Sequence, residues 1–350
     1  MTGFEDDAVE DNATITPDDE DEGGTHKDSA ESIRHSEETE SGLSDKNSGM
    51  YAASTKSLVG SILDYPIEHG RRYCGSGPNA YFMPNDDLEQ TRLNIVHQMH
   101  LYILEGRLTT APISDTPERI LDIGTGTGEW AIGMAEMYPD AEVIGTELSA
   151  IQPDAVPSNV YFEIDDAEEE WTFTTFFDFI HIRNLSGAFS NWLAIYRQSF
   201  RHLKPGGYIE VIDFDHLETP KPAPDSFMTI FNGALRQAFE TTGMPWSVGH
   251  LKRSMFEMTG FTEIKSTVIE IPIGIWAADA SQRLIGKMWL IAYLESLEAI
   301  SLRLLTKVLH WTPEAVHDIC EKVKKELADG GMRLITPVHF VTARKPLDAE

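Results

Sequence analysis

The sequence predicts an α/β fold, in which a parallel sheet carries helices on both faces. Apolar runs typical of buried strands alternate with helical patterns five times between residues 119 and 213. A glycine-rich turn at residues 124–128 joins the first of these strands to the first helix. Polar residues follow several strands, and open parallel sheets bind their ligands beyond the carboxyl ends of the strands. These three observations predict both the architecture and the edge of the sheet that holds the site.

The first βαβ unit occupies residues 119–148. Apolar side chains over residues 120–123 predict its first strand. The helix is predicted from apolar residues at four-residue spacing, namely Trp130, Met134 and Tyr138. Pro139 stops this helix, and a second strand begins at residue 143. That strand leads to Glu147, nineteen residues after Gly128, so an acid stands at its tip.

The spacing of the glycines separates two classes of cofactor. A dinucleotide-binding turn reads G-x-G-x-x-G, but the third glycine position is occupied here by Glu129, whose carboxylate would repel a diphosphate. The sequence instead has G-x-G-x-G, which suits a ligand without phosphate, such as S-adenosylmethionine. Small residues let the backbone approach its methionine portion, and Glu147 can accept hydrogen bonds from both ribose hydroxyls. An ordinary turn that binds nothing is the alternative.

The third strand, residues 160–164, runs directly into Asp165, Asp166 and Ala167. This places two acids at the edge of the sheet where the cofactor is expected. The carboxylate of Asp166 can accept a hydrogen bond from the amino group of adenine. The alternative is that Asp166 caps a helix before the acidic run at residues 168–170.

The fourth strand, residues 177–182, ends at His181 and Arg183. Helical spacing resumes at Trp192, and a turn at residues 203–207 leads to the fifth strand, residues 208–212, which ends at Asp213. The residues predicted to bind the cofactor are Asp122, Gly124, Thr125, Gly126, Gly128, Glu147, Leu148, Asp165, Asp166, Ala167 and Arg183.

The first 50 residues differ sharply in composition from the rest. They hold 16 acidic residues against 3 Lys or Arg, and so contribute −13 to the formal net charge of −29. Because this segment lacks periodic apolar residues, we expect it to be a disordered acidic tail. It is either a solvated extension or a binding arm. Without clustered Lys and Arg, we expect no direct binding to nucleic acid.

The cysteines and the apolar segments indicate in which cellular compartment the protein is expected. Cys74 and Cys320 are far apart and have no metal-type spacing, so we predict no metal site and a reduced, cytoplasmic or nuclear environment. The longest apolar stretch, residues 288–305, contains Glu295, Glu298 and Arg303. We therefore expect no membrane span and no membrane partner.

A helix is predicted ahead of the first strand, behind the capping candidates Asn85 and Asp86. We expect it to cover one edge of the sheet. Tyr81 and the turn at residues 84–86 either fold over the cofactor or merely anchor the start of this helix.

Five segments together resemble the class I S-adenosylmethionine-dependent methyltransferases, namely LDIGTGTGEWA, VIGTEL, FEIDDAEEEW, FDFIHIR and LKPGGYIE. More narrowly, YFMPNDDLEQTRL and AIQP resemble the fungal LaeA-like methyltransferases, which include the velvet-associated regulator of secondary metabolism. The resemblance covers residues 79–346. It implies a Rossmann-like sheet of seven strands with an antiparallel last strand, so that residues 261–271 form strand six and residues 338–343 form strand seven.

The resemblance also implies a domain organisation. A methyltransferase domain at residues 79–346 would have its core at residues 115–215. Residues 220–260 and 275–330 would form a helical lid over a substrate pocket, or would simply pack. Within the second of these segments, Thr312 and Pro313 fit a helix start, and Gly330 and Gly331 fit a helix end.

Methyl transfer requires a positioned acceptor and, for a hydroxyl acceptor, removal of a proton. His181 and His216 are the candidate catalytic bases, and His250 is a third, although each of these histidines is more often structural. After strand four the chain reads HIRN, not the Asp/Asn-Pro-Pro-aromatic turn of many base and amide methyltransferases. This difference counts against N-methylation of a base or an amide.

Three functions compete. The first is a methyltransferase that acts on a small molecule of fungal secondary metabolism. The second is a LaeA-like regulator that binds the cofactor but works through protein partners, including a velvet-type partner. The third, an NAD-dependent oxidoreductase, is disfavoured by Glu129.

Overall fold

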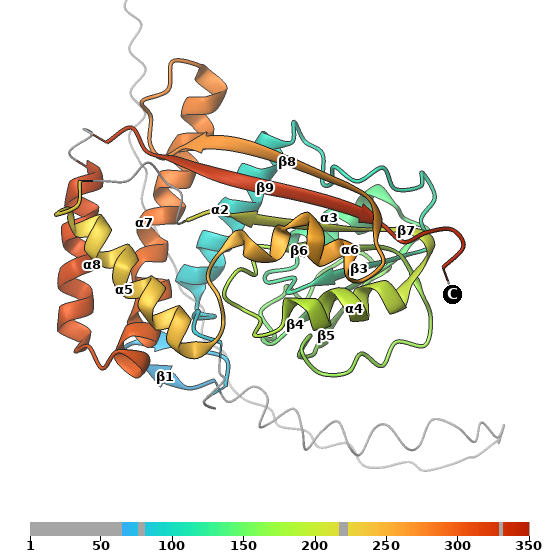
Figure 1. The fold of residues 1–350 in the computed structure, drawn as a ribbon, viewed down its shortest axis with the longest axis horizontal. Helices are drawn as coiled ribbons and strands as arrows, with labels where there is room; N and C mark the ends of the chain where they lie inside the picture. The colour runs from blue at the N-terminus through green and yellow to red at the C-terminus, as the bar shows by residue number, and fades with distance from the viewer. Residues whose placement is uncertain (1–64, 76–80, 217–222, 329–331, 350) are drawn as a thin grey trace, which may run out of the picture. The chain divides into compact units, whose positions relative to one another are not determined.

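Seven strands of the described chain form one sheet at the centre of the fold (Figure 1). The computed structural model describes residues 65–75, 81–216, 223–328 and 332–349, all within the unit Ala53–Glu350. The predicted start of the domain at residue 79 stays a prediction. The predicted acidic tail, residues 1–50, lies outside the described residues, as do Gly330 and Gly331.

The order of the strands confirms the predicted sheet. Across the sheet they are β5 (Val160–Ile164), β4 (Glu142–Glu147), β3 (Arg119–Ile123), β6 (Phe177–Arg183), β7 (Leu203–Phe214), β9 (Ile335–Arg344) and β8 (Thr262–Pro272). Neighbours from β5 to β7 are parallel, whereas β9 is antiparallel to both β7 and β8. The strand order reverses between β3 and β6, so a crevice for ligands is expected at the carboxyl ends of β3, β4 and β6.

Strand β7 begins earlier than the sequence predicts. Residues 203–207, expected to form a turn, belong to β7 in the structure. Leu203 pairs with Phe177, and after a shift in register Tyr208 pairs with Phe179. Five residues of β7 therefore stand opposite two of β6, and Gly206 adopts a positive φ of 85° within this bulge.

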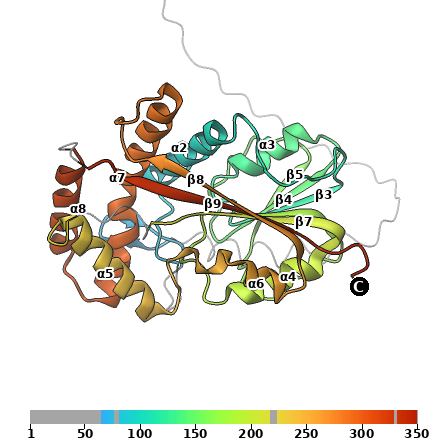
Figure 2. The same ribbon diagram turned by 45° about the horizontal axis from the view of Figure 1, so that its top comes forward.

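Consecutive residues of β3 enter apolar clusters on opposite faces of the sheet. Ile120 packs with Trp130 and Met134, whereas the next residue, Leu121, packs with Ile195. The covering helices are α3 (Glu129–Met137) on one face and α4 (Trp192–His202) with α6 (Arg253–Glu257) on the other (Figure 2). This arrangement is the one expected for parallel strands buried on both sides.

Three more helices form a layer beside the sheet (Figure 1). They are α5 (Phe227–Thr242), α7 (Ala280–Val308) and α8 (Pro313–Ala328). They share one apolar cluster with residues of β7, β8 and β9. Helix α8 begins at Pro313, and the hydroxyl of Thr312 accepts a hydrogen bond from the N–H of Ala315 (3.2 Å), so this predicted helix start is confirmed. The predicted role of this layer as a lid stays a prediction.

Helix α2 (Asp87–Ile103) begins where the sequence predicts but lies elsewhere on the sheet. Asp86 caps it by accepting a hydrogen bond from the N–H of Glu89. Val96 and Met99 are buried in the same cluster as Ile212 of β7 and the side chains of α7. The edges of the sheet are β5 and β8, so the expectation that α2 covers an edge is wrong. The apolar stripe of α2 is long enough to pack against both β7 and α7.

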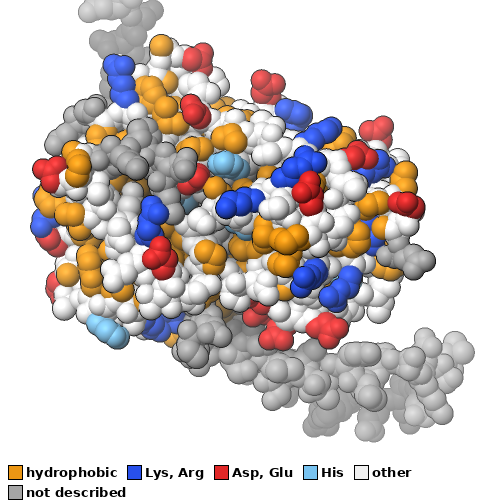
Figure 3. All heavy atoms as spheres, viewed as in Figure 1, with side chains coloured by type: hydrophobic (Ala, Val, Ile, Leu, Met, Phe, Trp, Pro, Cys, Tyr) orange, Lys and Arg blue, Asp and Glu red, His pale blue; other side chains and the backbone are white. Residues whose placement is uncertain are grey.

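Acidic and basic side chains are interspersed with apolar ones on the face drawn in Figure 3. Among the helices that the structure describes, none combines the length and the apolar character needed to cross a membrane.

Candidate active site

Two neighbouring cavities open at the carboxyl ends of the parallel strands. The larger has a volume of about 170 Å³ and the smaller about 80 Å³. Both are lined by Tyr81, Gly124, Glu147 and Leu185. The two cavities are therefore parts of one crevice that meet at Glu147, as expected where the strand order reverses.

The glycine turn contributes the floor of the larger cavity. Gly124 and Gly126 have φ values of 65° and 59°, a left-handed conformation that favours glycine. A Cβ on Gly126 would approach only Leu93, at 3.5 Å. A Cβ on Gly124 would come within 2.7 Å of Leu185. Gly126 thus leaves its backbone open to the cavity, which suits close approach of a ligand.

Gly128, predicted to contact the cofactor, has a packing role in the structure. It caps α3 with a φ of 81°, and a Cβ there would come within 2.4 Å of the Phe162 ring. Among the residues described around the two cavities, Thr127 and Glu129 line the larger one, and Gly128 lines neither.

Glu147 holds the turn against the end of β4. Its Oε2 accepts a hydrogen bond from the N–H of Gly126 (3.1 Å), and its Oε1 accepts one from the N–H of Leu148 (2.8 Å). Burial raises the pKa of this carboxyl, which the backbone N–H groups partly offset by favouring the charged form. Each oxygen keeps a lone pair, so the carboxylate can accept further hydrogen bonds from a ligand.

The smaller cavity gathers the residues that follow β4 and β5. Leu148, Asp165, Asp166 and Ala167 all line it, as predicted from the strand ends. The Oδ1 of Asp166 accepts a hydrogen bond from the N–H of Glu168 (3.0 Å), in a turn and not at a helix start. Partial burial and the neighbouring Asp166 raise the pKa of Asp165.

Asp122 is bound within the protein beneath the turn. Its Oδ2 accepts a hydrogen bond from the hydroxyl of Thr125 (2.6 Å), and its Oδ1 lies 2.7 Å from Nδ1 of His181. The His181 ring stacks on Trp130, with ring centroids 3.7 Å apart and planes within 5°. Asp122 therefore orients Thr125 and His181, with one contact on each oxygen of its carboxylate.

Arg183 places a cation at the end of β6. Its Nη2 lies 3.2 Å from Nδ1 of His97 on α2, and both residues line the larger cavity. Burial lowers the pKa of this guanidinium, against the opposing charges of Asp122 and Glu210. His97 is a site residue that the sequence alone did not indicate, because it is one histidine of an amphipathic helix.

The three candidate bases differ in their surroundings. His216 lines the larger cavity and stacks on Trp246, with centroids 4.9 Å apart. Burial lowers its pKa to about 3, with a further contribution from Arg92, so it is a weak base. His250, in the 3-10 helix η1 (Val248–Leu251), is buried with Nε2 3.0 Å from Asp213 and does not line either cavity. His181 lines the larger cavity but is held by Asp122.

A strap, defined as residues 65–75 and 81–86, also contributes to the site. It contains the short strands β1 (Ile67–Glu68) and β2 (Arg71–Arg72). The N–H of Ala150 donates to the Tyr65 hydroxyl (2.7 Å), and Nδ2 of Asn85 donates to the hydroxyl of Ser149 (3.0 Å). Cys74 and Tyr81 of the strap line the larger cavity. The turn at residues 84–86 thus contacts the site as well as the start of α2.

Arg303 fastens the strap to α7. Its side chain is 0% exposed, and its guanidinium donates to the carbonyls of Cys74 (3.3 Å), Gly75 (2.8 Å) and Tyr81 (3.1 Å). It also binds Glu68 (3.2 Å) and lies 4.6 Å from the centre of the Tyr73 ring. A charge inside the apolar stretch 288–305 was the only sequence signal for this residue.

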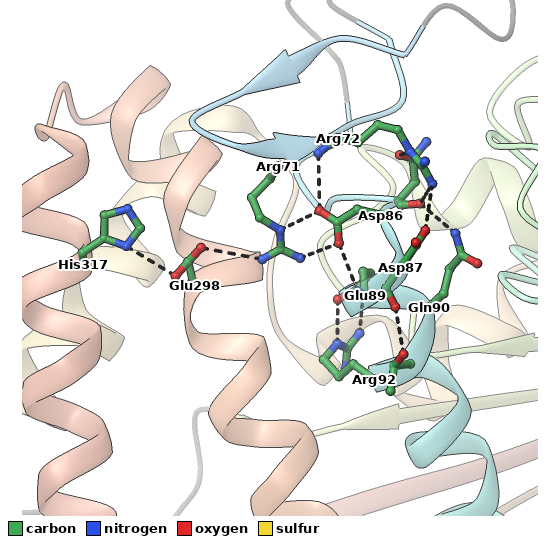
Figure 4. A network of polar contacts seen from close by, with 11 residues as sticks. Arg71, Arg72, Asp86, Asp87, Glu89, Gln90, Arg92, Glu298 and His317 are labelled. Atoms are coloured by element: carbon green, nitrogen blue, oxygen red, sulfur yellow. Dashed lines mark hydrogen bonds and ion pairs between the residues drawn. The ribbon is translucent and has the colours of Figure 1, made fainter.

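A chain of ion pairs also connects the strap to helices α7 and α8 (Figure 4). Arg71 binds both oxygens of Asp86 (2.6 and 2.9 Å) and lies 3.8 Å from Glu298 of α7. Glu298 in turn lies 3.3 Å from His317 of α8. The strap is therefore bound to α2, α7 and α8 together.

The sheet, the G-x-G-x-G turn and the acid at the end of β4 define a class of protein, the S-adenosylmethionine-dependent methyltransferases. A family described as "Methyltransferase domain" matches residues 95–264. The chain is 36% identical over 298 residues to "Methyltransferase pytC" of Aspergillus terreus, covering 84% of this chain and 92% of that protein. It is 37% identical over 290 residues to "Secondary metabolism regulator LAE1" of Cochliobolus heterostrophus, covering 80% and 94%.

A further relative, "Protein-methionine methyltransferase laeA" of Emericella nidulans, is 33% identical over 288 residues, covering 80% of this chain and 76% of that protein. Among solved structures, the Haemonchus contortus phosphoethanolamine N-methyltransferase 2 complex matches with a TM-score of 0.43 at 18% identity, covering 73% of this chain and 52% of that one. The chain belongs to the fungal LaeA-like family of S-adenosylmethionine-dependent methyltransferases.

The buried guanidinium of Arg303 should be important for stability. Arg303→Met leaves the carbonyls of Cys74, Gly75 and Tyr81 without this donor, so we expect a loss of about 3 kcal/mol in the free energy of unfolding. Lys307→Met is the matched control, because Lys307 binds the same Glu68 (2.8 Å) but is 40% exposed. That variant should lose less than about 1 kcal/mol. Urea unfolding measures both, and equal losses would contradict the assigned role.

Neutral buried histidines should make stability depend on pH. Burial lowers the pKa of His97 and of His216 to about 3, and holds that of His100 well below its usual range. As the pH falls through 6.5, the unfolded chain takes up protons at these positions and the folded chain does not. Their stabilising contribution is complete above this pH and is lost towards pH 3.

The free energy of unfolding should therefore fall by about 1.4 kcal/mol per pH unit for each such histidine below pH 6.5. Urea unfolding between pH 7.5 and 5.0 measures this slope. His97→Asn should flatten it, whereas His310→Asn, at an exposed position, should leave it unchanged. An identical slope in both variants would show that His97 is not neutral in the folded state.

Proposed function

We propose that this methyltransferase acts on a small molecule of fungal secondary metabolism. The observation that carries the proposal is the larger cavity, in which the glycine turn is continuous with a pocket walled by side chains of α5 and α7. A cavity of this size, walled by apolar side chains with a few polar groups, fits a small acceptor better than a protein segment. The similarity to "Methyltransferase pytC" supports the same choice.

The residues at the crevice fit S-adenosylmethionine. Gly126 leaves its backbone open towards the larger cavity, where a methionine portion can lie. The Glu147 carboxylate faces both cavities and can accept hydrogen bonds from ribose hydroxyls, and Asp166 can accept one from an adenine amino group. We assign Gly124, Thr125, Leu148, Asp165 and Ala167 to the same binding surface, with Asp122 acting through Thr125.

The bound cofactor supplies an activated methyl group on a sulfonium. The chain itself then has to orient the acceptor and exclude water. We assign Arg183 to the cofactor side, where its charge can bind a carboxylate. His216 faces the acceptor, but its pKa of about 3 gives it little power to remove a proton. His181 orients the turn through Asp122, so we keep it as a positioning residue.

A regulatory function through protein partners is the second candidate. It is favoured by the similarity to proteins named "Secondary metabolism regulator" and by the acidic composition of residues 1–50. The partner would be of the velvet type, and the protein would work in the cytoplasm or the nucleus. Such a function would still use the cofactor site.

The two candidates are separated by following the methyl group. The full chain is incubated with methyl-labelled S-adenosylmethionine and a fungal extract divided into small-molecule and protein fractions. Label in a small molecule, lost in Glu147→Ala, supports the proposal. Label confined to protein contradicts it and favours the second candidate.

Because the backbone of Gly126 is open to the cavity, we expect a side chain at this position to block cofactor binding. Gly126→Val should abolish S-adenosylmethionine binding in calorimetry, because the side chain would occupy the cavity. The positive φ itself should cost about 1–2 kcal/mol of stability. Gly106→Val is the matched control, since Gly106 also has a positive φ (85°) and open space around it, but does not line either cavity.

Both variants should therefore lose similar stability, and only Gly126→Val should lose binding. Wild-type affinity in a folded Gly126→Val would place the cofactor elsewhere.

A further inference from the structure

One wall of the larger cavity is a row of nearly parallel rings. His216 stacks on Trp246 (centroids 4.9 Å apart, planes within 18°) and on Trp289 (6.0 Å, 29°). Trp289 stacks on Phe214 (4.3 Å, 15°). These rings come from the end of β7, the segment after α5, and α7, so three separate parts of the chain align their ring planes at one place. We call the part of the cavity that they border the ring chamber, closed further by Phe231 and Leu235 of α5.

Several charged groups that line the larger cavity are paired with other side chains. Arg92 binds both oxygens of Glu89 (2.6 and 2.8 Å). Asp213, at the end of β7, accepts a hydrogen bond from the N–H of Ser186 (3.2 Å) and lies 3.0 Å from His250. The ring chamber itself is bordered by aromatic and aliphatic side chains. An unpaired charge placed there would lose its hydration without gaining a partner.

Tyr293 brings a single hydroxyl into this apolar surrounding. The residue is 7% exposed and lines the larger cavity, and among the described residues its hydroxyl has no hydrogen-bond partner. Burial raises its pKa, so the hydroxyl stays protonated and can donate. The indole N–H of Trp289, in contrast, is already used by the hydroxyl of Thr336 (2.8 Å). Because Tyr293 lines the cavity, its hydroxyl can donate to a ligand that brings an acceptor oxygen.

We propose that the ring chamber binds the methyl acceptor as an uncharged, planar, ring-containing molecule, with an oxygen that accepts a hydrogen bond from Tyr293. This inference rests on the proposed function, because it names the class of acceptor for the same site. Because the rings of the wall already stack on one another, a flat ring would meet them edge to face, an arrangement that aromatic pairs favour. An uncharged molecule also avoids the cost of burying a charge. The side chains of Lys and Arg are excluded as acceptors on the same ground.

Three probes of similar size test the chemistry of the chamber at pH 7. They are 2-naphthol, which is planar and uncharged, naphthalene-2-sulfonate, which is planar and anionic, and decahydro-2-naphthol, which is uncharged but not planar. Equilibrium dialysis against the full chain, with S-adenosylhomocysteine present, measures the three dissociation constants. We expect 2-naphthol to bind at least about tenfold more tightly than either of the others. Equal binding of the sulfonate or of the saturated alcohol would overturn the proposal.

Variants of α7 locate the bound probe. Ser296 lines the cavity, so Ser296→Trp should fill the chamber and abolish binding of 2-naphthol. Glu295→Trp adds the same side chain at the preceding position, which is exposed, and should leave binding unchanged. Tyr293→Phe should weaken binding of 2-naphthol about fivefold and leave binding of naphthalene, which has no oxygen, unaffected. Unchanged binding of 2-naphthol in Ser296→Trp would overturn the proposal.

Calorimetry with S-adenosylmethionine separates this inference from the proposed function. Ser296→Trp should keep wild-type affinity for the cofactor while it loses the probe, which supports a separate acceptor chamber. Loss of cofactor affinity in Ser296→Trp would show that Ser296 belongs to the cofactor site and would overturn the assignment of the chamber. The two ideas can also fail separately. If the methyl label enters only protein, the proposed function fails. If 2-naphthol is still bound more tightly than the other two probes, the ring chamber nevertheless binds planar, uncharged rings.

Discussion

The carboxylate of Glu147 is the interaction on which the site depends. It accepts hydrogen bonds from Gly126, in the turn after β3, and from Leu148, after its own strand. Two neighbouring strand ends are thereby held at a fixed separation, and the two cavities meet at this group. Burial raises the pKa of this carboxyl, and the backbone N–H groups oppose that effect by favouring the charged form. A ligand that supplies hydroxyls would add to the same set of donors.

Beneath the turn, the sheet carries polar side chains where a core would ordinarily be apolar. Asp122, His181 and Glu210 occupy paired positions on β3, β6 and β7, and all are buried. Buried polar groups are tolerated when they are hydrogen-bonded. Asp122 meets this condition through His181 and Thr125. Glu210 meets it at Oε1, which accepts from the N–H and hydroxyl of Thr110, whereas its Oε2 and the Nε2 of His181 have no partner among the described residues. The polar row thus connects the interior of the sheet to the conformation of the turn.

Helix α7 both lines the larger cavity and binds the strap. Arg303, near its C-terminal end, holds the strap whose residues Cys74 and Tyr81 line the larger cavity. Trp289 and Tyr293, three to four turns earlier, border the ring chamber. A shift of this helix would therefore move two parts of the lining of the larger cavity together. The ion pairs from Arg71 to Glu298 reinforce the same connection.

The sequence by itself determined the parts that are encoded locally. The strands, the glycine turn, the acid at residue 147 and the acids after β5 are read from neighbouring residues, because side-chain periodicity and turn chemistry act within a few residues. The family resemblance supplied the order of the last two strands. Only the tertiary structure decided that Gly128 packs on Phe162, that His250 binds Asp213, and that Arg303 holds Cys74 across 229 residues. Such contacts depend on where the chain returns in space, and no local pattern records that.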